Sequence, residues 1–184
     1  MDGARPPWAA RPSDSLAKER TPRRERRHRL PRTEYLGTVL VSFTACVADG
    51  LRPFMQPGHI AEVLSLMRES TLKFACDVPL YCFMPDLLHV VFLGTSNDAD
   101  CYSAMIRLKQ ISGFRMKRWS PPTRWQKDFY DRVIRSDEQR DVLWYVALNP
   151  VRAGVCHDWD EYCFTGSIGH DVRSVLEHGV RVGH

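Results

Sequence analysis

The sequence contains two long apolar runs that are separated by only two residues. VPLYCFM spans residues 78–84 and LLHVVFLG spans residues 87–94, with Pro85 and Asp86 between them. Runs rich in β-branched and aromatic residues favour extended strands, and a Pro-Asp pair suits a short turn. We therefore expect an antiparallel β-hairpin, which restricts the chain to fold classes that contain an antiparallel sheet.

The segments around this hairpin predict one more strand and three helices. GTVLVSFTACVA (37–48) reads as a central strand, and the apolar positions that follow Pro57-Gly58 recur at helical spacing for about three turns. Further helices are expected over 101–114 and from Ser136-Asp137-Glu138 to about residue 148, because those three polar residues suit a helix start and Asn149-Pro150 suits a helix end. This order predicts an α+β fold, a ferredoxin-like sandwich with an antiparallel sheet and helices on one face.

Length and charge predict one domain between two tails. The chain has 184 residues, of which 43% are hydrophobic, enough for one core. Residues 1–32 carry ten Lys/Arg against four Asp/Glu and five prolines, so we expect a disordered basic arm over 1–33, a folded domain over 34–168 and a C-terminal tail over 169–184. A basic arm of this kind can hold phosphate backbones non-specifically, but a solvated arm without a binding role is equally compatible with this composition. No apolar run is long enough to cross a bilayer, so we expect no membrane partner and a cytoplasmic location.

A second concentration of basic residues lies inside the expected domain. Between residues 107 and 135, nine Lys/Arg face only two Asp, and five aromatic residues are interleaved with them. Cations that neutralise phosphates and rings that stack on unpaired bases suit single-stranded nucleic acid, although a merely solvated basic face is the alternative. We expect Trp125 and Phe129 to belong to the core. The candidate DNA-binding residues are Arg107, Lys109, Arg115, Lys117, Arg118, Lys127 and Arg132.

Three stretches, taken in order, resemble one family. They are MPDLLHVVF (84–92), WQKDFYDRVIR (125–135) and WYVALNPVRAGV (144–155), and EYCFTGS (161–167) resembles the closing segment of the same family. Together they resemble the single-tyrosine HUH transposases, especially the REP-associated branch. The resemblance implies a ferredoxin-like fold and a metal-dependent tyrosine transposase. Such an enzyme cuts single-stranded DNA beside a hairpin and leaves a 5′-phosphotyrosine link.

Carried over by position, the resemblance assigns roles to individual residues. Tyr145 is the nucleophile, and Mg²⁺ or Mn²⁺ is held by two strand histidines and by a polar residue one helical turn beyond the tyrosine. In this sequence those ligand positions are Leu87, His89 and Asn149. The first histidine is therefore replaced by an alkyl side chain, which leaves a weak metal site or none, because a lost ligand costs at least the 10 to 100-fold that a lost outer-shell partner costs.

The residues themselves allow plainer interpretations. Tyr145 and Asn149 are spaced i, i+4, so a helix brings them to one face, and His89 is expected to project from a neighbouring strand toward a shared basic trough. However, Asn149 before Pro150 also suits a simple helix terminus, and His89 on an apolar strand suits a core histidine. Tyr130 is a rival nucleophile, and Tyr145 is preferred because of its position on a helix.

Two functions follow from these observations. The first is a DNA strand transferase, impaired by Leu87, and the second is a catalytically silent protein that binds hairpin or single-stranded DNA. A structural or protein-interaction domain is a third class, which requires that neither form of DNA binds. The sequence leaves the choice between a monomer and a homodimer open.

Overall fold

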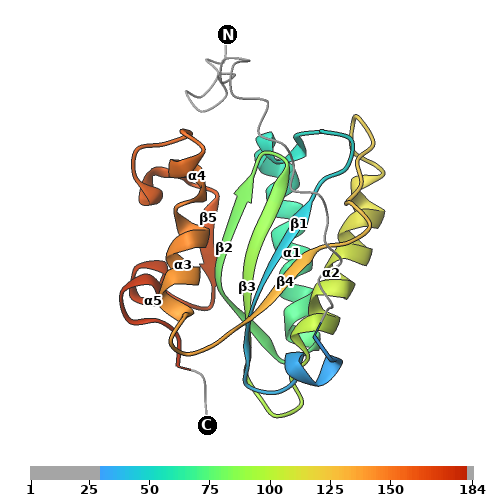
Figure 1. The fold of residues 1–184 in the computed structure, drawn as a ribbon. Coiled ribbons are helices and arrows are strands. Elements are labelled where there is room, and N and C mark those ends of the chain that lie inside the picture. The colour runs from blue at the N-terminus through green and yellow to red at the C-terminus, as the bar shows by residue number, and fades with distance from the viewer. Residues whose placement is uncertain (1–29, 182–184) are drawn as a thin grey trace.

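A computed structural model describes residues 30–181 of the chain. It contains one five-stranded antiparallel sheet in the order β4-β1-β3-β2-β5, with helices packed against it (Figure 1). Residues 1–29, which form most of the predicted basic arm, lie outside the described residues. Between residues 30 and 181, no helix is both long and apolar enough to span a membrane. The strands are β1 (Leu40–Cys46), β2 (Cys76–Met84), β3 (Leu87–Gly94), β4 (Tyr130–Ile134) and β5 (Thr165–Ile168).

The predicted hairpin forms the middle of this sheet. In it, β2 and β3 pair in antiparallel register, and Met84 opposite Leu87 closes the turn at Pro85-Asp86. β1 pairs with the other edge of β3, and His89 lies opposite Thr44. The order β4-β1-β3-β2, with α1 and α2 as connections, is the ferredoxin-like arrangement that the sequence predicted, and β5 extends it beside β2.

The helices are more numerous than the sequence patterns indicated, and α1 and α2 are longer, whereas α3 is shorter than expected. The apolar pattern of α1 ends at Met67, but the helix continues to Lys73, because Ser70 and Thr71 are also buried and their hydroxyls donate to the carbonyls of Ala104 and Met67. The α-helices are α1 (Pro57–Lys73), α2 (Cys101–Met116), α3 (Gln139–Ala147), α4 (Asn149–Arg152) and α5 (Val172–His178), and the 3-10 helices are Arg32–Tyr35, Pro53–Met55 and Trp159–Glu161.

Helices cover both faces of the sheet, which corrects the expectation that they lie on one face. On one face, α1 and α2 pack on alternate residues such as Phe43, Val90 and Phe92. On the other face, α3 and α5 pack on the residues between them, including Val91 and Leu93. Figure 1 shows these two helices on the side of the sheet away from α1 and α2. The sheet is therefore the middle layer of three. Trp125 and Phe129 are both buried in the α1 and α2 layer, which confirms the predicted core role of these two rings.

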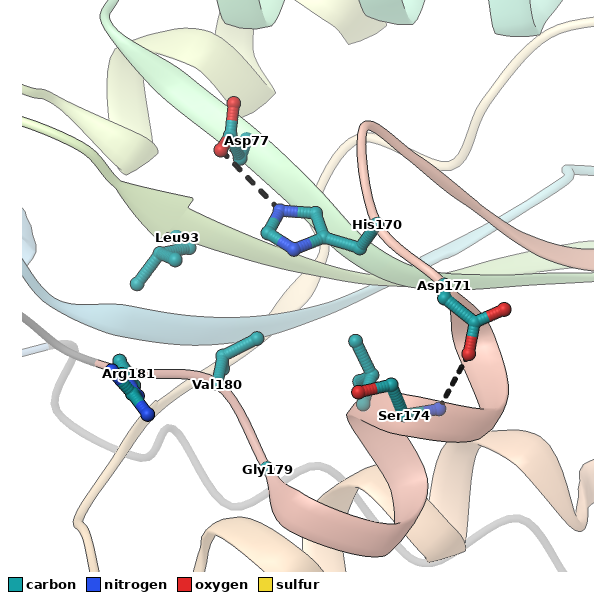
Figure 2. A pocket seen from close by; sticks show the side chains of 9 residues that line it. Asp77, Leu93, His170, Asp171, Ser174, Gly179, Val180 and Arg181 are labelled. Carbon is teal, nitrogen blue, oxygen red and sulfur yellow. Dashed lines mark hydrogen bonds and ion pairs between the residues drawn. The ribbon is translucent and has the colours of Figure 1, made fainter.

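The C-terminal segment is part of the packed structure rather than the predicted tail from residue 169. Val175 and Leu176 of α5 are buried beside α3 and β2. The segment is also tied by polar contacts, since His170 Nε2 lies 3.3 Å from Asp77 Oδ2 and the Ser174 N–H donates to Asp171 Oδ1 at 2.7 Å (Figure 2). These contacts surround a shallow hollow that shares no lining residue with the site described below.

Two short strands and one helix start differ from the sequence-based expectations. β4 carries YDRVI and β5 carries TGSI, and neither segment has the apolar density of the other strands. α3 begins at Gln139, and the predicted cap is absent, since no side chain caps its N-terminus. The preceding residues instead form a turn in which the Glu138 N–H donates to the Arg135 carbonyl, and Glu138 pairs with Arg132 of β4 at 2.7 Å.

Candidate active site

Tyr145 and His89 meet across the interface between α3 and the sheet. Their ring centroids are 6.3 Å apart and the rings are nearly perpendicular, at 85°. His89 lies on β3 and is 7% exposed, whereas Tyr145 lies near the C-terminal end of α3 and is 54% exposed. The predicted convergence of phenol and imidazole is therefore present, with the imidazole fixed in the interior and the phenol open to an incoming ligand.

His89 is held by polar partners on two sides. Its Nδ1 lies 2.8 Å from Thr44 Oγ1 on the neighbouring strand, and the Asn149 side chain is close enough to influence the pKa of the ring. Burial and, to a smaller extent, the nearby Arg152 guanidinium lower the pKa of His89 to about 4, against the opposing effect of Asn149. The imidazole is therefore neutral at pH 7. It is held in one orientation and packs edge-on against the Tyr145 ring.

The lowered pKa of His89 predicts a loss of stability in mild acid. Between the ordinary pKa of 6.5 and the folded value of about 4, the unfolded chain gains a proton that the folded chain does not, so stability falls as the pH falls through this window. The total loss from this residue is about 3 kcal/mol, at up to ~1.4 kcal/mol per pH unit. Urea unfolding of the wild type and His89→Gln from pH 7 to 4.5 measures it, with exposed His178→Gln as the control. Equal pH slopes for the wild type and His89→Gln would contradict the assignment.

Asn149 connects the end of α3 to the short helix α4. Pro150 has no N–H, so it cannot donate to the Val146 carbonyl as a helical residue would. The Asn149 side-chain amide compensates, because its Nδ2 donates to the carbonyls of Tyr145 and Val146 at 2.9 and 3.3 Å. The interpretation of Asn149 as a helix-terminus residue is therefore confirmed. The same bonds fix its Oδ1 toward the side of the site where Arg152 lies.

Arg152 is a site residue that the sequence reasoning did not nominate. Its guanidinium lies 3.8 Å from the Tyr145 ring centroid, and its Nη2 donates to Asn149 Oδ1 at 3.0 Å and to the Tyr145 carbonyl at 3.2 Å. A signal for it was present, because residue 152 follows Tyr145 by seven residues and Asn149 by three, which is the spacing of one helical face.

The residues present do not fit a divalent cation. Leu87 supplies no lone pair and packs with the apolar residues under α3. The Asn149 oxygen already accepts from the Arg152 guanidinium, whose positive charge would repel a metal ion. Among residues 30–181, no group of three or more His, Cys, Asp or Glu side chains is arranged to hold a metal. We therefore assign no chemical step to Mg²⁺ or Mn²⁺.

Most of the predicted DNA-binding residues lie away from Tyr145. Arg107, Arg115, Lys117 and Arg118 belong to α2 or directly follow it, on the face of the sheet opposite α3, so the expected trough shared with Tyr145 does not include them. Several already have intramolecular partners: Arg107 pairs with Glu69, Arg115 with Glu62, and Arg118 lies over the Phe114 ring. Lys109 donates to the carbonyls of Gln126, Lys127 and Asp128, which fixes the segment before β4.

The α3 side of the sheet offers a different surface. Thr44 is paired with both His89 and Tyr130, and Ser42 is paired with Arg132, so these side chains share the face of the sheet on which Tyr145 lies. Tyr130 is 67% exposed and Arg132 is also exposed. Of the predicted DNA-binding residues, Arg132 is the one that the strand register places on this face beside the candidate site.

The fold and the site define an α+β protein with an exposed tyrosine set against a strand histidine. No protein-family model matches the sequence, and no curated protein matches it. Among solved structures, a REP-associated tyrosine transposase bound to a REP hairpin is similar, with a TM-score of 0.62 and 16% identity over 80% of this chain and 86% of that chain. A bacterial tRNA(His) guanylyltransferase-like protein in complex with GTP is less similar, with a TM-score of 0.41 and 13% identity over 72% of this chain and 70% of that chain. The first likeness shows that the two proteins share a fold.

Proposed function

We propose that this protein is a DNA strand endonuclease and strand transferase that acts on single-stranded DNA flanked by a hairpin. Tyr145 is the nucleophile, and the intermediate is a 5′-phosphotyrosine. The observation that carries the proposal is the half-exposed Tyr145 phenol, which lies against buried His89 and under the Arg152 guanidinium. The similar solved structure, a REP-associated tyrosine transposase bound to a REP hairpin, supports the class of substrate.

The proposed reaction exchanges one phosphodiester for another. The phenolic oxygen of Tyr145 forms a bond to phosphorus and the bond from phosphorus to the 3′-oxygen breaks. The phenolic proton passes through solvent and ends on that oxygen, which leaves as a 3′-hydroxyl. Attack of another 3′-hydroxyl on the phosphotyrosine reverses these changes and joins two strands. The protein contributes the position of the phenol and the electrostatic field around the phosphate.

A catalytically silent DNA-binding protein is the second candidate function. Leu87 at the expected ligand position and the poor fit of the site to a divalent cation favour it. Both candidates use the surface around Arg132 and Tyr130, and both predict binding that weakens with salt. They differ in covalent chemistry alone.

One experiment separates the candidates. The full chain is incubated with a pool of DNA hairpins that carry randomised single-stranded flanks and a fluorescent label at the 3′ end, so that the label stays on the fragment joined to Tyr145. The proposal predicts a labelled protein band that survives denaturation. Salt-sensitive binding without such a band would support the silent DNA-binding protein instead. A chain that binds neither hairpin nor single-stranded DNA at low salt would contradict both.

A further inference from the structure

Arg152 is held against the nucleophile by contacts from three directions. The guanidinium lies over the Tyr145 ring, and its Nη2 is bonded to Asn149 Oδ1 and to the Tyr145 carbonyl. These contacts come from the end of α3 and from α4, which are joined by the side-chain bonds of Asn149. A planar guanidinium stacked on a ring and anchored through one nitrogen has few alternative positions, so its remaining donors point in fixed directions.

The charge of Arg152 is not neutralised by a carboxylate of residues 30–181. Other arginines of this segment form ion pairs: Arg32 with Asp100, Arg132 with Glu138, and Arg173 with Asp160. No Asp or Glu in the described part of the chain lies within ion-pair distance of Arg152, which is exposed. An exposed, oriented guanidinium that lies over a tyrosine ring and has no carboxylate partner among residues 30–181 is suited to bind a phosphate, because its donors match two phosphate oxygens.

Next to Arg152, the side chains at the expected metal-ligand positions are unsuited to bind a metal ion. Leu87 has no ligand atom, and the Asn149 oxygen is already an acceptor for Arg152. A metal ion and this guanidinium would compete for one oxygen and repel each other. The positive charge at the site is therefore supplied by the Arg152 guanidinium and not by a bound metal ion.

We propose that Arg152 binds the scissile phosphodiester and stabilises the negative charge that develops on it, in place of a bound divalent cation. This inference rests on the proposed function, since it assigns the cation for attack by Tyr145. Arg152 forms no covalent bond in the step: it donates hydrogen bonds to the non-bridging phosphate oxygens while Tyr145 replaces the 3′-oxygen at phosphorus. The consequence is strand cleavage that does not depend on added metal.

The test measures the rate of adduct formation on the labelled hairpin pool with EDTA and with Mg²⁺ or Mn²⁺. We expect rates within about 2-fold of each other in the wild type, and a loss of about 10² to 10³-fold in Arg152→Ala, the range for removal of one charge-stabilising donor. Arg152→Lys restores part of the rate, because it keeps the charge and loses the planar fork. Arg173→Ala, which removes another arginine that lies near an aromatic ring, is the matched control and leaves the rate unchanged. A rate abolished by EDTA, or an unchanged rate in Arg152→Ala, would overturn the inference.

A second measurement decides the inference even if the wild type forms no adduct under any condition, a result that defeats the proposed function alone. Fluorescence anisotropy compares a hairpin with a single-stranded flank and the same hairpin without it. Arg152→Ala is expected to weaken binding of the flanked hairpin about 10-fold more than binding of the bare hairpin, as loss of a phosphate contact requires. Equal effects on both oligonucleotides, or site-specific Mn²⁺ broadening of the His89 ring signals in the wild type, would reject a phosphate-binding Arg152.

Discussion

Tyr145→Phe is expected to abolish the covalent protein–DNA adduct while leaving the fold and DNA binding intact. The substitution removes only the phenolic oxygen, and loss of a nucleophile commonly costs at least about 10³-fold in rate. The ring and its contacts with His89 and Arg152 remain, and Tyr145 is 54% exposed, so the free energy of unfolding should change by less than about 0.5 kcal/mol. The labelled-hairpin assay and urea unfolding measure the two effects.

The control for this variant is Tyr130→Phe. Tyr130 is the rival nucleophile, and it is exposed on β4 on the same face of the sheet as His89. We expect Tyr130→Phe to keep adduct formation within a few-fold of the wild type. An adduct that persists in Tyr145→Phe and is lost in Tyr130→Phe would move the nucleophile to the sheet.

Gly94→Ala is expected to destabilise the fold by about 3 kcal/mol, the upper end of the range for forcing an extra carbon into a packed site. Gly94 ends β3, and a Cβ at this position would lie 1.9 Å from the carbonyl oxygen of Gly37. That oxygen belongs to the backbone and cannot rotate away. The backbone of Gly94 also cannot move away without cost, because its N–H donates to the Val39 carbonyl at 2.9 Å and that hydrogen bond would be lost.

A matched glycine gives the opposite result. A Cβ at Gly58, the second residue of α1, has no atom within 4 Å. Gly58→Ala is therefore expected to stabilise the fold by up to about 1 kcal/mol, because alanine loses less backbone freedom in a helix. Urea unfolding of both variants checks the pair. Equal stabilities of Gly94→Ala and the wild type would mean that β3 and the Gly37 segment are farther apart than described.

The hairpin and the meeting of Tyr145 with His89 were predictable from the sequence. The runs that form β2 and β3 are dense in strand-forming residues and separated by a turn pair, so local preferences agree with the final fold. The family resemblance then related the strand histidine to the helix tyrosine. β4 and β5 were not predicted because each is a short edge strand with polar residues, and edge strands need not be apolar.

The second helical layer was missed although a signal for it existed. VVFLG in β3 has consecutive apolar residues, and strands that are buried on both faces are continuous apolar runs rather than alternating ones. That pattern indicates helices on both faces. It also explains why the cations of α2 and the phenol of Tyr145 lie on opposite sides of the sheet, since each helix covers one of the two apolar faces.

Arg152 was missed for a different physical reason. Its role depends on the near-continuity of α3 and α4 across Pro150, where a simple rule ends the helix at the residue before proline. The Asn149 side chain donates to the Val146 carbonyl, which Pro150 leaves without a donor, and also to the Tyr145 carbonyl, so α3 and α4 are joined across the proline. Sequence rules that consider only backbone donors do not account for hydrogen bonds from a side chain such as Asn149 to these carbonyls.

Mass spectrometry of the covalent adduct tests whether Tyr145 is the nucleophile. The adduct formed on the labelled hairpin pool is digested with nuclease and protease, and the modified peptide is sequenced. We expect a nucleotide remnant joined through a 5′-phosphate to the Tyr145 hydroxyl. A remnant on any other residue, or a chain that binds the hairpins and yields no modified peptide, would contradict it.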